Sequence, residues 1–184
     1  MLPRQALQPI GPLMIEHRLI ERLIDELRRE TERIRDTRSV DTDLLYRVID
    51  FLHTYVDRTH HGKEEDILFA ALEDKPLTDE QRALMSELTA EHETSVELIE
   101  RLRLLRRKHL AEGEGVLDEI IVVLDELVEF YPLHIFKEDR RFFLPVMAHF
   151  TDDEMTAMLE RMKSFDQGMI HEKYSRLVDG LKDG

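Results

Sequence analysis

One ten-residue pattern occurs twice in this chain of 184 residues. It reads His-x-x-Lys-Glu-acid-x-x-(Leu/Phe)-Phe and spans residues 60–69 and then 134–143. Two matching dipeptides, Glu16-His17 and Glu91-His92, are separated by almost the same length of chain. Two independent pairs of matching sites at nearly one offset indicate a duplicated unit. The repeated polar side chains include His and Glu, which hold transition metals in proteins, so the repeat predicts a metal protein with approximate two-fold symmetry.

Apolar residues recur at helical spacing through most of the chain. They predict four long helices, over about residues 13–37, 42–74, 79–112 and 116–147. Asp41 or Thr42 is expected to cap the second helix, and Thr78 begins a capping box before the third. Long helices joined by short turns most simply form an up-down-up-down four-helix bundle. The predicted fold class is therefore all-α, with one or two additional C-terminal helices.

The segment after the fourth helix is also expected to be helical. Thr151 begins another capping box, for a short fifth helix, and Gly168 is expected to separate this helix from a last helical stretch. We predict a single domain over residues 1–184, with the bundle at about 11–149 and a C-terminal helical extension at about 150–184. The extension is expected to cover the bundle or to contact a second copy of the chain, so a homodimer is one option.

Composition and charge exclude several classes of function. The net charge of −14 argues against nucleic acid or an anionic membrane as partner, because both require a basic face. The absence of cysteine excludes disulfides, thiolate zinc sites, iron–sulfur clusters and cysteine nucleophiles. A membrane span requires an apolar run of about 18 residues, and no run in this chain approaches that length. The N-terminus also lacks the apolar core of a signal peptide. The expected location is the cytoplasm.

Six residues form the predicted metal site: His17, His60, Glu64, His92, His134 and Glu138. The two His-x-x-x-Glu pairs each point from one face of a helix. Counting outward from the three predicted turns places all six within about one helical turn of a common plane across the bundle. Four imidazoles and two carboxylates suit two ions with bridging carboxylates. Nitrogen and oxygen ligands without sulfur favour two iron ions, with manganese or zinc as substitutes.

Comparison of the two copies of the repeat separates ligands from their neighbours. His61 corresponds to Ile135, and Glu138 rather than Asp139 corresponds to Glu64. His61, Glu65 and Asp139 are therefore predicted to lie on the solvent side or to support the ligands. Further residues one or two turns from the motifs, or in the C-terminal segment, are weaker candidates for contact with the site: His53, Asp57, Tyr131 and His171.

On the six predicted ligands, residues 11–149 resemble the hemerythrin-like, or HHE cation-binding, family, in the branch with the pattern H…HxxxE…H…HxxxE. This resemblance implies a four-helix bundle that holds a non-haem di-iron centre and binds or reacts with oxygen, nitric oxide or peroxide. Oxygen-carrying members have a further histidine one turn after the third-helix histidine, where this chain has Val96. We therefore expect an open position for a small ligand where Val96 replaces an imidazole.

Three classes of function remain open from the sequence. The first is a non-enzymatic di-iron protein that binds or senses oxygen, nitric oxide or iron. The second is a di-iron enzyme, acting as an oxidase, a peroxidase or a nitric oxide reductase, or in iron–sulfur repair. The third is a structural helical module that uses its acidic surface to bind another protein. A small diatomic ligand or peroxide is the expected partner in the first two.

Overall fold

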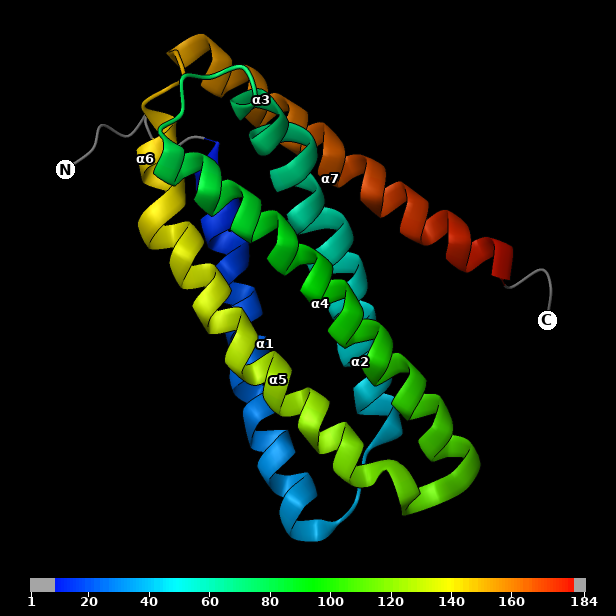
Figure 1. Ribbon diagram of the computed structural model, residues 1–184. Helices are drawn as coiled ribbons and strands as arrows, with labels where there is room; N and C mark the ends of the chain where they lie inside the picture. The colour runs from blue at the N-terminus through cyan, green and yellow to red at the C-terminus, as the bar shows by residue number, and fades with distance from the viewer. Residues whose placement is uncertain (1–8, 181–184) are drawn as a thin grey trace.

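Five helical rods make up the part of the chain that the structure describes, residues 9–180 (Figure 1). This computed structural model describes the side chains of that range except at residues 114 and 170–180. In chain order the elements are α1 (Ile10–Thr37), α2 (Thr42–Phe51), η2 (Leu52–His61), η3 (Glu64–Phe69), α3 (Ala70–Leu72), α4 (Asp79–Glu112), η4 (Gly113–Val116), α5 (Leu117–Lys137), η5 (Glu138–Phe142), α6 (Phe143–Met147) and α7 (Asp152–Gly180). The elements from α2 to α3 form one rod, as do those from α5 to α6, and η2, η3 and η5 have wider, π-type turns.

The first four rods alternate in direction and close into a ring (Figure 1). α1 packs beside α5, α4 contacts both α5 and α2, and η2 returns to α1. The predicted all-α, up-down-up-down bundle is confirmed, and the one or two helices predicted after it are a single helix, α7. That residues 1–184 form a single domain, made of the bundle and a C-terminal extension, stays a prediction.

Three of the predicted helix starts, those of α2, α4 and α7, are capped as the sequence indicates. The carboxylate of Asp41 accepts hydrogen bonds of 2.9 Å from the backbone N–H groups of Asp43 and Leu44 at the start of α2. Thr78 and Gln81 form a reciprocal capping box before α4. These bonds satisfy backbone donors that have no partner inside a helix, so they determine where each rod begins.

The helix α7 lies against the second rod, where it contacts η2 and η3. This approach depends on Gly62, because a Cβ at that position would lie 2.8 Å from Cζ of Phe165. α7 continues through Gly168, so the predicted break there is wrong. One glycine costs a helix only about 1 kcal/mol. The methionine side chains of α7 pack in an apolar cluster of the core, and this packing offsets the cost.

The core of the bundle consists of two apolar clusters with a polar layer between them. On α1, Ile10 and Leu13 belong to the smaller cluster, while Ile20 and Ile24 belong to the larger one. The buried residue between them is His17. The same order, apolar then polar then apolar, recurs on the other three rods of the bundle. Burial of each large apolar side chain contributes about 1.5–3 kcal/mol, so the clusters hold the polar layer in position from both sides.

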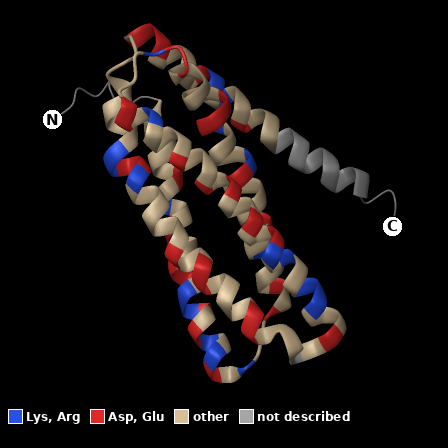
Figure 2. Ribbon diagram, in the orientation of Figure 1, with Lys and Arg blue, Asp and Glu red and all other residues tan. Residues whose placement is uncertain are grey.

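Charged side chains follow the rods on the outside of this core. Figure 2 shows basic residues interspersed with acidic ones along the bundle. Within residues 9–180, none of the helices combines the length and the apolar character that a membrane span requires.

Candidate metal centre

All six predicted ligands meet in the polar layer, and each is at most 3% exposed. They come from four rods: His17 from α1, His60 from η2, Glu64 from η3, His92 from α4, His134 from α5 and Glu138 from η5. Both Glu residues begin a stretch of π-type turns. Such turns are rare and are frequent at functional sites.

The carboxylate of Glu64 lies between imidazoles of two different rods. Its Oε1 is 3.3 Å from Nε2 of His60, and its Oε2 is 3.3 Å from Nε2 of His92. One side chain therefore spans both halves of the site.

The carboxylate of Glu138 repeats this arrangement from the opposite rod. Its Oε2 is 3.1 Å from Nε2 of His17, and its Oε1 is 3.3 Å from Nε2 of His134. Each glutamate thus faces one imidazole from the pair His17 and His60 and one from the pair His92 and His134. The predicted two-fold relation between the copies of the repeat is present in the positions of these side chains.

Each of the four imidazoles is held from behind by a carboxylate. The Nδ1 atoms donate to Asp139 (from His17, 2.7 Å), Glu16 (from His60, 2.8 Å), Glu65 (from His92, 2.6 Å) and Glu91 (from His134, 2.9 Å). A carboxylate on one ring nitrogen fixes the tautomer and leaves the other nitrogen as a lone-pair donor. All four Nε2 atoms are therefore directed into the centre.

The atoms that face the centre have no hydrogen-bond partner among the described residues. This holds for Nε2 of all four histidines and for both carboxylate oxygens of Glu64 and Glu138. Leaving a buried polar group unpaired costs about 1–3 kcal/mol, and more for a charged group. Eight unpaired donor atoms around one space therefore fit cations. Their chemistry, imidazole nitrogen with carboxylate oxygen, suits two transition-metal ions.

A model of the Hemerythrin HHE cation binding domain matches residues 8–146 of this chain. The chain belongs to this family. All six predicted ligands lie inside the matched residues. No curated protein and no solved structure matches the sequence.

In this HHE domain, the lysine and the second acidic residue of the repeat also have structural roles. In the first copy, Lys63 forms an ion pair with Glu16, which holds His60 of that copy. The second acidic residue, Glu65, holds His92 of α4.

The second copy of the repeat makes the corresponding contacts. Lys137 pairs with Glu91, which holds His134, and Asp139 holds His17. The sequence prediction assigned the ligands but gave no role to either lysine or to Glu16 and Glu91. Their presence at matching positions of both copies was the signal that pointed to them.

Positive charge is favoured between the two central carboxylates. Burial alone would lower the pKa of His17, but the hydrogen bond to Asp139 and the nearby carboxylate of Glu138 raise it to about 10. The pKa of His92 is likewise lowered by burial and raised by Glu138 and Glu64, to about 11. Burial raises the pKa of Glu138, yet the imidazoles around it hold that pKa well below its usual range.

His61 was predicted to lie on the solvent side or to support the ligands, and the solvent side is wrong, because His61 is only 3% exposed. Its ring stacks on that of His92, with 3.9 Å between the centroids and 10° between the planes. The corresponding residue, Ile135, is equally buried, so this position faces the core in both copies. Comparison of the two copies correctly gave His61 no histidine counterpart. A missing counterpart does not mean, however, that the side chain is exposed. In a π-type segment, successive residues are turned by a smaller angle, so His60 and His61 can both face inward.

The clusters that could hold metal ions therefore include one more histidine than predicted. One group of ligand atoms comes from His17, His60, Glu64 and Glu138, and the other from His61, His92 and His134. In each group the ligand atoms lie within 4.8 Å of one another. His53 belongs to neither group and is only half-buried. The side chain of His171 lies outside the described residues.

Val96 does not stand in the place of a missing imidazole. Its side chain is 44% exposed, and the residue of that turn that faces the core is Ser95. The hydroxyl of Ser95 donates to Asp57 over 2.9 Å, and the hydroxyl of Tyr131 donates to Ser95 over 2.9 Å. Desolvation raises the pKa of this buried Asp57 to about 7. The expected open position at Val96 is therefore wrong, and a buried polar chain lies beside the site instead.

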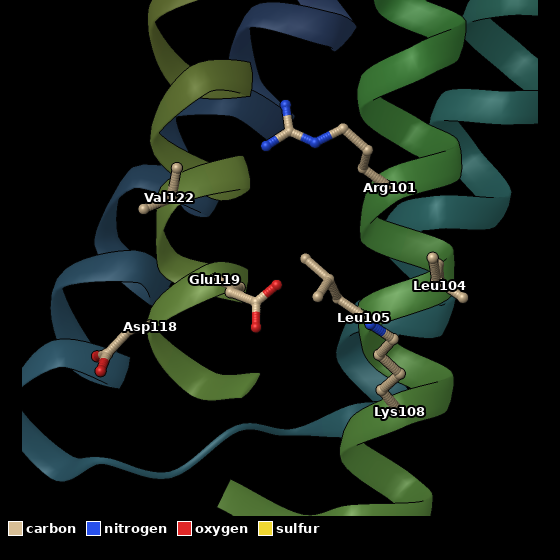
Figure 3. Close-up of a pocket in the computed structure, with 7 residues that line it drawn as sticks. All are labelled: Arg101, Leu104, Leu105, Lys108, Asp118, Glu119 and Val122. Atoms are coloured by element: carbon tan, nitrogen blue, oxygen red, sulfur yellow. The ribbon is translucent and has the colours of Figure 1, made fainter. Parts of the chain in front are cut away.

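A surface groove of about 360 Å³ lies between α4 and α5, away from the metal centre (Figure 3). It is lined by Arg101, Leu104, Leu105, Lys108, Asp118, Glu119 and Val122. None of these residues is a histidine, and Arg101 is separated from His92 by about 14 Å along α4. The groove is therefore not part of the metal centre.

Proposed function

We propose that this hemerythrin HHE domain holds two iron ions and binds or senses a small diatomic ligand, oxygen or nitric oxide. One observation carries the proposal: eight buried donor atoms face one space without hydrogen-bond partners, while the reverse side of every imidazole is held by a carboxylate. Packing alone gives no reason to orient four imidazoles in this way. Sensing of iron itself by the same ligands is included in the proposal.

Each ligand has a definite role in this proposal. His17 and His60 would hold one ion and His92 and His134 the other, and Glu64 and Glu138 each face one imidazole of both pairs. Bound iron would supply electrons to a small ligand, and manganese or zinc could substitute as the ion. The carboxylates behind the rings hold the proton at Nδ1, direct Nε2 toward the ion and raise the basicity of the imidazoles. The apolar clusters on both sides limit the access of water to the polar layer.

Metal analysis of the purified protein tests this proposal. After anaerobic loading with ferrous iron and removal of free metal, we expect about two irons per chain, as the donor set suits two ions. The double variant His60→Ala/Glu64→Ala is expected to retain much less iron. His53→Ala, on the same rod but in neither ligand group, is the matched control and should load like the parent protein. Equal iron content in all three proteins, or none in the parent, overturns the proposal.

A di-iron enzyme is the second candidate, as an oxidase, a peroxidase or a nitric oxide reductase, or in iron–sulfur repair. The hydrogen-bonded chain of Asp57, Ser95 and Tyr131 favours it, because reduction of oxygen, peroxide or nitric oxide consumes protons and a buried polar chain can deliver them. Stopped-flow spectra of the reduced protein separate the two candidates. A reversible spectral change on addition and removal of the ligand supports binding, and repeated turnover with a reductant supports catalysis.

Several finer expectations stay predictions from the sequence. These are the cytoplasmic location, the absence of nucleic acid and membrane partners, and the homodimer. If the metal analysis finds no bound iron, a structural helical module without metal is the candidate that remains.

A further inference from the structure

We propose that a groove between α2 and α4 binds a small polyphosphate anion through three arginines of α4. The groove has a volume of about 520 Å³, and its lining includes Tyr46, Asp50, His53, Arg103, Arg106 and Arg107. A cavity of this size accommodates a small organic ligand. The inference does not depend on the proposed metal function, because none of these residues belongs to a metal-ligand group.

The three arginines share one face of α4. Residues 101–108 contain five basic side chains, and Arg106 and Arg107 follow Arg103 by three and four residues. Side chains at this spacing are neighbours on a helix surface, where like charges repel one another. The other two, Arg101 and Lys108, line the groove between α4 and α5 (Figure 3). An anion bound among the first three would relieve their repulsion.

The guanidinium of Arg106 is held in position from two sides. Its Nε donates to the backbone oxygen of Thr42 over 2.7 Å, and its Cζ lies 5.1 Å from the centre of the Tyr46 ring. The hydrogen bond and the cation–π contact together fix the plane of the group. Its Nη groups form no hydrogen bond or ion pair with the described residues. They present the forked pair of donors that binds a phosphate group through two parallel hydrogen bonds.

The acidic side chains of the groove balance the arginines only in part. Arg103 forms an ion pair with Glu100, and Asp50 lines the groove. Arg107 is exposed and pairs with none of the residues whose side chains the structure describes. Three guanidinium groups therefore face two carboxylates, and Arg106 and Arg107 keep donors for a bound anion.

The imidazole of His53 responds to this excess of positive charge. Burial lowers its pKa first, and the charges of Arg103 and Arg58 lower it further. The opposing effects of Glu100 and Asp50 are smaller. The potential in the groove is thus positive, although the whole chain carries a net charge of −14. A short anion suits such a local field, whereas a long polyanion would also meet the acidic remainder of the surface.

The groove on the α5 side of α4 has a different balance of charge. There Arg101 pairs with Glu126, and Asp118 and Glu119 line the groove beside Lys108. Two basic side chains thus meet three acidic ones, which leaves no excess positive charge for an anion. Because both grooves use the same turns of α4, Arg101→Gln/Lys108→Gln is a matched control that removes two charges from the same helix.

Calorimetric titration of the full chain with inorganic tripolyphosphate tests the inference. We expect one anion per chain. Arg103→Gln/Arg107→Gln should weaken binding about tenfold or more, because the anion loses charge-assisted hydrogen bonds. Arg106→Lys should weaken it about threefold or more, because lysine keeps the charge but loses the planar fork. The control Arg101→Gln/Lys108→Gln should bind within about twofold of the parent protein, the effect of long-range charge alone.

A titration with ATP identifies the source of the polyphosphate. Tighter binding of ATP than of tripolyphosphate, with the preference lost in Tyr46→Leu, indicates a nucleotide whose base stacks on the exposed ring of Tyr46. Equal affinities indicate that the phosphate chain alone is recognised.

Three results would overturn the inference. The first is no binding of tripolyphosphate by the parent protein. The second is equal affinity in the parent protein and Arg103→Gln/Arg107→Gln, which would place the anion elsewhere, the metal centre included. The third is an equal loss in the two double variants, which would mean that only total charge matters. Glutamine is a good helix former, so circular dichroism should show intact helices in every glutamine variant.

Discussion

The lysine of the repeat occupies two different environments, although its sequence context is nearly the same in both copies. Lys63 is fully buried between Glu16 and Asp166 of α7, with 2.8 Å to the latter. Lys137 is 21% exposed and pairs with Glu87 and Glu91 of α4. Removal of one partner of a buried pair costs about 3–5 kcal/mol, whereas an exposed pair contributes about 0–1 kcal/mol.

Lys63→Met is therefore expected to destabilise the protein by about 3 kcal/mol. Lys137→Met, the control from the second copy of the repeat, should cost about 1 kcal/mol or less. Urea unfolding followed by circular dichroism measures both changes as shifts in the free energy of unfolding. Equal losses in the two variants would mean that the cover provided by α7 has no energetic effect on Lys63.

The carboxylates behind the imidazoles should control metal affinity. Glu91 holds Nδ1 of His134, whereas Glu87, one turn earlier on α4, pairs with Lys137. We expect Glu91→Gln to weaken iron binding by about 10- to 100-fold, because the ring loses its fixed orientation and some basicity. Glu87→Gln should leave it unchanged. Competition with a coloured chelator gives both affinities, and a similar loss in the two variants would contradict this role of Glu91.

At the scale of the elements, the docking of α7 depends on one glycine and tolerates the loss of another. A Cβ at Gly62 would lie 2.8 Å from the Phe165 ring, while a Cβ at Gly168 would meet nothing within 4 Å. Gly62→Ala should cost about 1–3 kcal/mol through overpacking. Gly168→Ala should instead stabilise the protein by about 0.5–1 kcal/mol, because alanine favours a helix more than glycine does.

Hydrogen exchange of the α7 backbone measures these effects where they arise. Gly62→Ala should speed exchange in α7, and the double variant Gly62→Ala/Phe165→Ala should restore part of the protection by removing the clash. If the double variant exchanges as fast as Gly62→Ala alone, contact with the Phe165 ring is not the cause.

The start of α7 should respond to pH through Glu154. This carboxylate pairs with Lys75 and accepts from the backbone N–H of Thr151, and these contacts lower its pKa from 4.5 to about 2. A lowered folded-state pKa contributes stability above pH 4.5, and the contribution disappears as the pH falls toward 2. The melting temperature of Glu154→Ala should therefore lie below that of the parent protein at pH 6 and approach it near pH 2. A difference that does not change with pH would contradict the assignment.

At the scale of the whole molecule, the sequence predicted the features that depend on local periodicity. Helix starts such as Asp41 and Thr78 follow from residues next to them, and equal distances from the turns brought His17, His60, His92 and His134 to one height. The orientation of a residue within a rod was harder to predict. A straight α-helix places Val96 one turn beyond His92 on the same face, yet Ser95 is the residue that faces the core.

The other differences arise from contacts between rods. The π-type turns of η2 and η3 bring His61 inward beside His60, and no residue next to His61 in the sequence indicates this change of period. The continuity of α7 through Gly168 depends on packing against the second rod and the smaller apolar cluster. Local patterns therefore located the six candidate ligands, whereas tertiary contacts decided which of their neighbours face the same layer.

Metal binding should stabilise the whole molecule, because the ligands join all four rods of the bundle at a layer that otherwise leaves unpaired polar atoms. An ion that binds only the folded chain adds about 4 kcal/mol at a free concentration a thousand times its dissociation constant. The iron-loaded protein should therefore melt at a higher temperature than chelator-treated protein, by several degrees for a chain of this size. His60→Ala/Glu64→Ala should melt at nearly the same temperature with and without iron. If iron leaves the melting temperature of the parent protein unchanged at saturating concentration, the polar layer does not join the four rods through metal.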